Sequence, residues 1–245
     1  SAMFGPIRIL IMPVRSLIQP VVAGIGDVAP LVFTCGGEMP LDTAAQQLVR
    51  NAYTRVDLVM DRGEFAVRGG LIDVFPPTAP HPVRIEFFGD EIDSIRQFHA
   101  SDQRTYGDEI DSIWATPCRE VQLTDEIRDR ARSLVGSIPN ADDMLESIAQ
   151  GIPVEGMESL IPALIDEMQP VSSMLPRGSV VMLSDPEKLR RAVDDLEKTA
   201  NEFLATSWSV AASGHGSGAP ITFDQANFLN YQEAVAQLMY SEREV

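Results

Sequence analysis

Apolar and polar residues alternate through residues 53–98, and this alternation predicts several short strands. The clearest examples are residues 65–68 (Phe-Ala-Val-Arg) and residues 83–88 (Val-Arg-Ile-Glu-Phe-Phe). Turns that contain glycine, proline or aspartate separate the segments, at residues 61–63, 69–70, 76–77 and 89–90. Since tight turns join antiparallel neighbours, we expect an antiparallel sheet in this part of the chain.

Two segments outside this block are continuous apolar runs instead. Residues 7–14 read Ile-Arg-Ile-Leu-Ile-Met-Pro-Val, and residues 179–183 read Ser-Val-Val-Met-Leu. Such runs are typical of strands buried on both faces, as in a parallel sheet flanked by helices. The simplest interpretation is a discontinuous α/β domain with an inserted, sheet-rich module at residues 31–116. Helical periodicity predicts helices at residues 42–52, 123–135, 142–150, 157–168, 186–204 and 228–240. Asp42 and Thr124 are the expected caps of the first two.

The chain is strongly acidic. Its 245 residues include 36 acidic and 19 basic side chains, a formal net charge of −17, which opposes broad binding to a phosphate backbone. The length suits one large or two modest domains. No apolar run approaches the ~20 residues of a membrane span. With only two cysteines, Cys35 and Cys118, and no export signal, we expect a cytoplasmic protein without a disulfide framework.

No set of residues fits a catalytic or metal-binding pattern. A phosphate-binding loop needs a lysine after its glycines, and the glycine-rich run at residues 214–218 has none, which indicates a linker. The histidines His81, His99 and His215 stand at no ligand spacing from one another or from a cysteine. Cys118, without a nearby histidine in the sequence, is expected to be a buried apolar residue. We therefore expect no catalytic residue, no metal and no cofactor.

One predicted strand, Val-Arg-Ile-Glu-Phe-Phe, has an unusual outward face. Alternation turns its Val, Ile and first Phe toward the core, so Arg84 and Phe88 share the other face with Glu86. The same parity turns Arg68 outward on its own strand. Arginine and aromatic side chains are enriched at binding hot spots, which favours a partner-binding surface of Arg68, Arg84 and Phe88. The sequence leaves open the alternative that Phe88 packs under a loop and the arginines pair with acids such as Glu86 or Asp90.

A longer motif carries a resemblance to a known family. Residues 68–77 read Arg-Gly-Gly-Leu-Ile-Asp-Val-Phe-Pro-Pro, and residues 83–96 read Val-Arg-Ile-Glu-Phe-Phe-Gly-Asp-Glu-Ile-Asp-Ser-Ile-Arg. These runs resemble the UvrB-homology region of the bacterial transcription-repair coupling factors (Mfd) and, more distantly, the nucleotide excision repair protein UvrB. Residues 101–104, Ser-Asp-Gln-Arg, agree better with the coupling factors. The resemblance is tight over residues 41–118 and looser elsewhere.

The resemblance implies a RecA-like domain that is split in sequence. Residues 4–30 would end its first half, residues 31–116 would form an inserted module that binds the ATPase UvrA, and residues 117–245 would form its second part. It further implies that a C-terminal domain of the full-length protein masks this module. Other parts of the full-length protein would contact RNA polymerase and DNA and bind and hydrolyse ATP.

Within the module, the family's partner-contact positions fall on Arg68, Arg84 and Phe88. This implies a non-catalytic fragment that recruits UvrA in transcription-coupled nucleotide excision repair. The chain departs from UvrB after residue 183, where UvrB has an Asp-Glu-x-His magnesium motif and this chain has Ser-Asp-Pro-Glu. Asp185 keeps one carboxylate there, but Pro186 replaces the catalytic Glu. The alternatives are a UvrB-like helicase subunit that binds ATP and DNA, and a purely structural domain whose arginines are satisfied internally.

Overall fold

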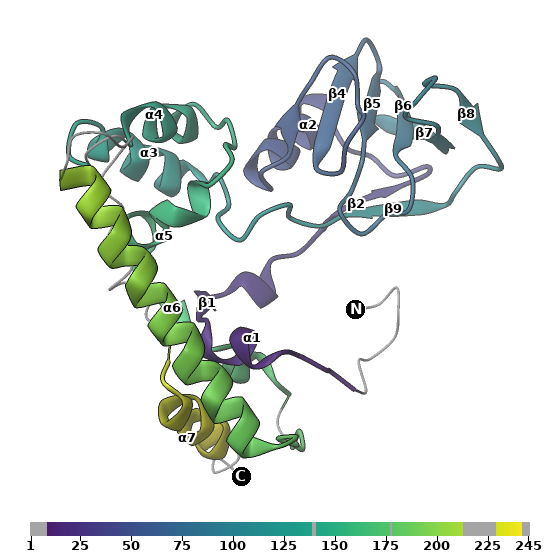
Figure 1. Ribbon diagram of the computed structural model, residues 1–245. Coiled ribbons are helices and arrows are strands. Elements are labelled where there is room, and N and C mark those ends of the chain that lie inside the picture. The colour runs from purple at the N-terminus through teal and green to yellow at the C-terminus, as the bar shows by residue number, and fades with distance from the viewer. Residues whose placement is uncertain (1–8, 139–140, 177, 213–228, 242–245) are drawn as a thin grey trace. The chain divides into compact units, whose positions relative to one another are not determined.

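The computed structural model describes residues 9–138, 141–176, 178–212 and 229–241 (Figure 1). The chain forms two compact units, one of residues 27–164 and one of residues 1–26 together with 165–245. Helices combined with antiparallel sheets confirm the α/β class. The first unit contains the whole of the predicted module at residues 31–116. In the described ranges, no helix is both long enough and apolar enough to cross a bilayer.

A six-stranded sheet lies at the centre of the unit of residues 27–164. Its strands have the order β3-β4-β5-β6-β7-β8, with β3 parallel to β4 and every other pair antiparallel. The strands are β3 (Thr54–Arg55), β4 (Glu64–Arg68), β5 (Leu71–Val74), β6 (Val83–Phe88), β7 (Glu91–Phe98) and β8 (Thr105–Tyr106). A separate antiparallel pair is formed by β2 (Leu31–Thr34) and β9 (Ser112–Ala115). The predicted antiparallel sheet is therefore confirmed.

One face of the six-stranded sheet packs against α2 (Leu41–Arg50), as Figure 1 shows. The pairing register sets Ile72, Ile85 and Ile95 side by side across β5, β6 and β7. These side chains are fully buried together with Phe65 of β4 and Leu48 of α2. Burying a side chain of this size contributes about 1.5–3 kcal/mol, so this cluster stabilises the unit substantially.

Short helices follow the sheet in the same unit. Thr124 caps the first of them as expected, because its Oγ1 accepts a hydrogen bond from the Ile127 N–H at 3.4 Å. The cap predicted at Asp42 is wrong: α2 begins at Leu41, and Pro40 occupies the N-cap position. Asp42 lies in the first turn, where its charge still favours the helix N-terminus. The predicted helix at residues 157–168 is shorter than expected and ends at residue 164. The bounds are α3 (Asp125–Leu134), α4 (Asp142–Ala149), a 3-10 turn (Met157–Leu160) and α5 (Ile161–Leu164).

The other unit is mainly helical. Its core gathers Leu17 and Ile18 with Val193, Ala234 and Leu238. The helices predicted at residues 186–204 and 228–240 are both present, the first of them longer than expected. The elements are α1 (Val14–Ile18), β1 (Val21–Val22), β10 (Met168–Gln169), α6 (Pro186–Ala212) and α7 (Tyr231–Ser241), with 3-10 turns at Ile25–Asp27, at the boundary between the units, and at Val171–Met174. β1 and β10 form a two-stranded antiparallel sheet.

The two predicted buried strands at residues 7–14 and 179–183 are wrong for the described residues. Residues 9–13 and 179–183 belong to no strand, and α1 begins at Val14. Ile9, Ile11, Val180 and Met182 have exposed fractions of 81 to 91%. A continuous apolar run becomes a buried strand only where neighbouring strands and helices cover both faces, and here no described residue pairs with either segment. The RecA-like arrangement therefore stays a prediction.

Candidate partner-binding site

The register of the sheet decides which residues share its second face, opposite α2. Across β4, β5, β6 and β7, one row of paired residues is Ala66, Asp73, Arg84 and Arg96. The row two positions further along is Arg68, Leu71, Glu86 and Ser94. Residues two positions apart on a strand point to the same face, so the two rows share one face. Arg68 and Arg84 therefore lie on one face, as alternation predicted.

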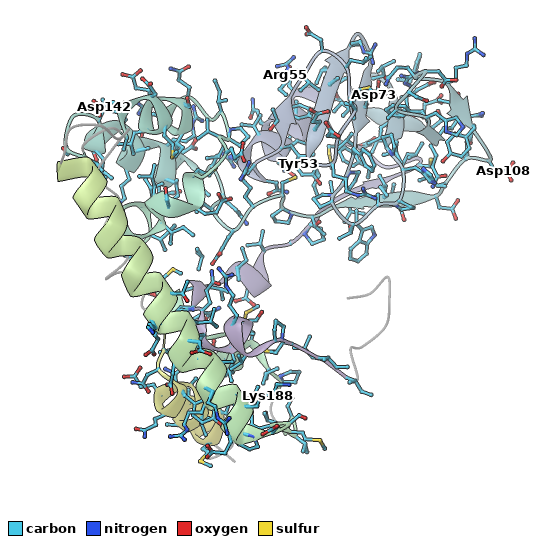
Figure 2. All side chains as sticks on the ribbon, viewed as in Figure 1. Tyr53, Arg55, Asp73, Asp108, Asp142 and Lys188 are labelled. Atoms are coloured by element: carbon cyan, nitrogen blue, oxygen red, sulfur yellow. The ribbon has the colours of Figure 1, made fainter. Side chains whose placement is uncertain are left out.

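A buried carboxylate joins the two arginines. Asp73 on β5 has a side chain with no exposed surface, and Figure 2 marks its place in the sheet. Its Oδ1 accepts a hydrogen bond from Arg84 Nε at 2.7 Å. Its Oδ2 accepts one from Arg84 Nη2 at 2.8 Å and one from Arg68 Nη2 at 2.7 Å. The two bonds to Arg84 fix the plane of its guanidinium group. The single bond to Arg68 holds only one of its nitrogen atoms.

Arg84 is held from other sides as well. Its Nη1 donates to the Gln103 carbonyl oxygen at 3.4 Å, and its guanidinium lies 5.2 Å from the centre of the Phe98 ring. The hydrogen bond to Asp73 raises the pKa of Arg84 above its ordinary value, so the guanidinium stays charged. Only 18% of the Arg84 side chain is exposed, against 45% for Arg68. Arg68 therefore keeps most of its five N–H donors available for another molecule.

The charges of this face nearly cancel. Asp73 and the exposed Glu86, in the same row as Arg68, offset the charges of Arg68 and Arg84, and Arg96 on the same face pairs with Glu109. The surface offers directed hydrogen-bond donors rather than a strong positive field.

Phe88 ends β6 and has 81% of its surface exposed. The hydrogen bond from the Phe87 N–H to the Gly70 carbonyl oxygen, 2.8 Å long, sets this end of β6 beside the turn that follows Arg68. The alternative that Phe88 packs under a loop is wrong. The same alternative expected the arginines to pair with acids such as Glu86 or Asp90. They do pair with an acid, but it is Asp73.

Arg68, Arg84 and Phe88 thus lie on the same face of the sheet, and the three are called the Arg/Phe surface. Alternation along the strands does not single out Asp73. The available signal was a lone carboxylate inside the otherwise apolar strand Leu-Ile-Asp-Val, whose partner depends on the pairing register.

The other residues considered as candidates have surroundings of their own. His81 and His99 flank Tyr106, with ring centres 5.7 and 4.0 Å from it. Burial raises the pKa of the Cys118 thiol to about 12, which keeps it protonated and weakly nucleophilic. Asp185 caps α6, since its Oδ1 accepts a hydrogen bond from the Lys188 N–H at 3.2 Å. Residues 214–218, with His215, lie outside the described residues.

Residues 31–120 match a family model described as the UvrB interaction domain. Over 231 residues, or 90% of its length, the chain is 45% identical to the transcription-repair-coupling factor of Mycobacterium tuberculosis, of which it covers 19%. The chain belongs to the transcription-repair coupling factor family. Its identity to the coupling factor of Myxococcus xanthus is 39% over 174 residues, which cover 66% of the chain and 14% of that protein. For that of Escherichia coli the identity is 31% over 204 residues, which cover 80% and 17%.

These comparisons confirm the resemblance inferred from the motif at residues 68–96. The chain spans about a fifth of the length of the coupling factors that it matches. The UvrB interaction domain at residues 31–120 contains all strands from β2 to β9. It therefore contains the complete Arg/Phe surface together with Asp73.

Proposed function

We propose that this part of a coupling factor is non-catalytic and binds UvrA through the Arg/Phe surface, recruiting it in transcription-coupled nucleotide excision repair in the cytoplasm. The observation that carries the proposal is the exposure of Phe88 on the same face of the sheet as two arginines held by Asp73. An exposed phenylalanine ring is costly in water unless a partner covers it, and aromatic and arginine side chains dominate binding hot spots. The description of the matched family, an interaction domain, is consistent with such a role.

The contacts of Asp73 explain how this surface could bind without a large ordering cost. Immobilising a side chain at an interface costs about 0.5–1.5 kcal/mol. Arg84 is already fixed by Asp73, Gln103 and Phe98 in the unbound chain, so little of that cost remains for it. In this proposal Phe88 supplies apolar burial and Arg68 donates hydrogen bonds to acceptors of the partner.

In the whole coupling factor, we propose that a C-terminal domain covers the Arg/Phe surface until UvrA is needed, while other parts bind RNA polymerase, DNA and ATP. Residues 4–30 and 117–245 would belong to a RecA-like scaffold that carries no catalytic group. The use of Asp185 as the cap of α6 supports this assignment over a UvrB-like helicase subunit, because its carboxylate has a structural role.

The test is a calorimetric titration of the chain with purified UvrA. Phe88→Ala is expected to weaken binding about 30-fold, because truncating a central anchor costs ~2 kcal/mol or more. The thermal melt should stay unchanged, since the side chain packs against little of its own fold. Leu58→Ala, at another exposed apolar side chain of the same unit, is the matched control and should bind like the parent. Equal affinity of Phe88→Ala and the parent would refute the proposal.

A further inference from the structure

A cleft of about 680 Å³ follows the β3 edge of the six-stranded sheet. One wall is the chain from Tyr53 to Asp57 together with the end of β4, and the other wall includes residues 151–153, which follow α4. Figure 2 labels Tyr53 and Arg55 at this edge. Pairing of β3 with β4 ends at Arg55 and Phe65, so the last part of β4 has no neighbour on this side.

The backbone along the cleft carries unpaired hydrogen-bonding groups. The Thr54 N–H donates to the carbonyl oxygen of Gly63, just before β4, at 2.8 Å, and the Val56 N–H donates to that of Phe65 on β4 at 2.9 Å. Alternation therefore turns the N–H and C=O of Arg55 away from β4. The Glu64 carbonyl oxygen accepts from the N–H of Phe75, just after β5, and the same alternation turns the backbone groups of Val67 toward the line of β3, one strand inside the edge that Arg55 forms. No described residue bonds to the backbone of Arg55 or Val67 on this side. An open sheet edge of this kind is a template for an added strand.

The side chains that line the cleft indicate what such a strand would carry. Val67 and Ile152 give it an apolar lining, and about half of Ile152 is exposed. Val56 also borders the cleft, but it packs against the cluster on the opposite face of the sheet from Val67. Arg55 is exposed and forms no ion pair with another described residue, although the chain as a whole carries a net charge of −17. Asp57 lies two residues further along, which disfavours a run of several acids. The complementary ligand is an extended segment with one apolar side chain and one carboxylate.

We propose that this cleft binds an extended segment of UvrA as a β-strand added beside Arg55 of β3, with a carboxylate on Arg55 and an apolar side chain against Val67 and Ile152. Arg68 lines the cleft and also belongs to the Arg/Phe surface, so one partner can reach both. This inference rests on the proposed function, because it extends the same interface.

Amide hydrogen exchange with and without UvrA tests the added strand. The N–H group of Arg55 should gain protection in the complex, since it would then donate a hydrogen bond to the new strand. Arg55→Ala should weaken UvrA binding about tenfold, the loss expected when a charged hydrogen bond is removed. Arg191→Ala, at an exposed arginine of the other unit, is the control and should have no effect.

The outcomes separate the two proposals. If UvrA binds in a Phe88-dependent way but leaves the amide of Arg55 unprotected, the cleft proposal is overturned and the proposed function stands. If UvrA does not bind the chain at all, both are overturned. Protection of this amide by a single-stranded oligonucleotide instead of UvrA would also overturn the cleft proposal, because its ligand would then be a nucleic acid.

Discussion

The substitution Asp73→Asn tests the electrostatic account of the Arg/Phe surface most directly. It keeps the shape of a side chain that has no exposed surface and removes its negative charge. Three charge-assisted hydrogen bonds lose their ionised acceptor, and one of the two oxygens becomes an amide nitrogen that faces guanidinium N–H groups. Arg84, with 18% of its side chain exposed, is left without a counter-charge.

The expected loss of stability follows from the exposure of each partner. Removing one member of a buried ion pair costs about 3–5 kcal/mol, and the partial exposure of Arg84 lowers its share of that cost. Arg68 is nearly half exposed and can be rehydrated, so its bond adds ~1 kcal/mol at most. We expect a total of about 3 kcal/mol, which for a unit of this size lowers Tm by about 10 °C.

Urea denaturation and a thermal melt at pH 7 measure this loss. Asp108→Asn is the matched control, because Asp108 is an exposed aspartate of the same unit, labelled in Figure 2, and its change should stay within about 0.5 kcal/mol of the parent. If Asp73→Asn is as stable as the control, the carboxylate does not hold the two arginines, and the argument for a preorganised surface fails.

Two further predictions concern the contact between Cys118 and the turn at Gly63. Because burial raises the pKa of Cys118 to about 12, alkylation of Cys118 at pH 9 should be roughly 500-fold slower in the folded chain than in urea, where the thiol has its ordinary pKa. The stability that this thiol contributes should be lost as pH rises from about 9 toward 12. Equal labelling rates of Cys118 in mass spectrometry would contradict this. Gly63→Ala should lower the free energy of unfolding in urea by about 1–2 kcal/mol, and by more than Gly107→Ala does. Both glycines have positive φ, but of the two only Gly63 would place the new Cβ against a side chain, 3.3 Å from Cys118 Sγ. A larger loss for Gly107→Ala would contradict this.

Local periodicity was sufficient to predict the faces of β6. Side-chain alternation depends only on neighbouring residues, so Arg84 and Phe88 could be assigned outward without knowing the partner strands. On β7, however, Ile92 and Ile95 are both buried although they are three residues apart. The register shifts between Glu86 and Phe87 of β6, which leaves one extra residue on β7. Such a bulge breaks the alternation, and the sequence pattern contains no signal for it.

The ion pairs and the exposed apolar runs could not be predicted for a related reason. The partner of Arg84 is set by the register between β5 and β6, which pairs it with Asp73 rather than with the nearer Glu86 of its own strand. Residues 179–183 have the composition of a buried strand, but composition does not provide the neighbouring strands. Both cases depend on contacts between distant segments, which no short window of sequence contains.

Because one carboxylate serves two guanidinium groups, the three positions are expected to vary together in evolution. A lineage that replaces Arg68 can keep Asp73, since Arg84 still neutralises it through two bonds. A lineage that replaces Asp73 first leaves two positive groups facing each other, which favours compensating changes at both arginine positions. The order in which these substitutions accumulate is therefore constrained, with Asp73 as the last of the three to change.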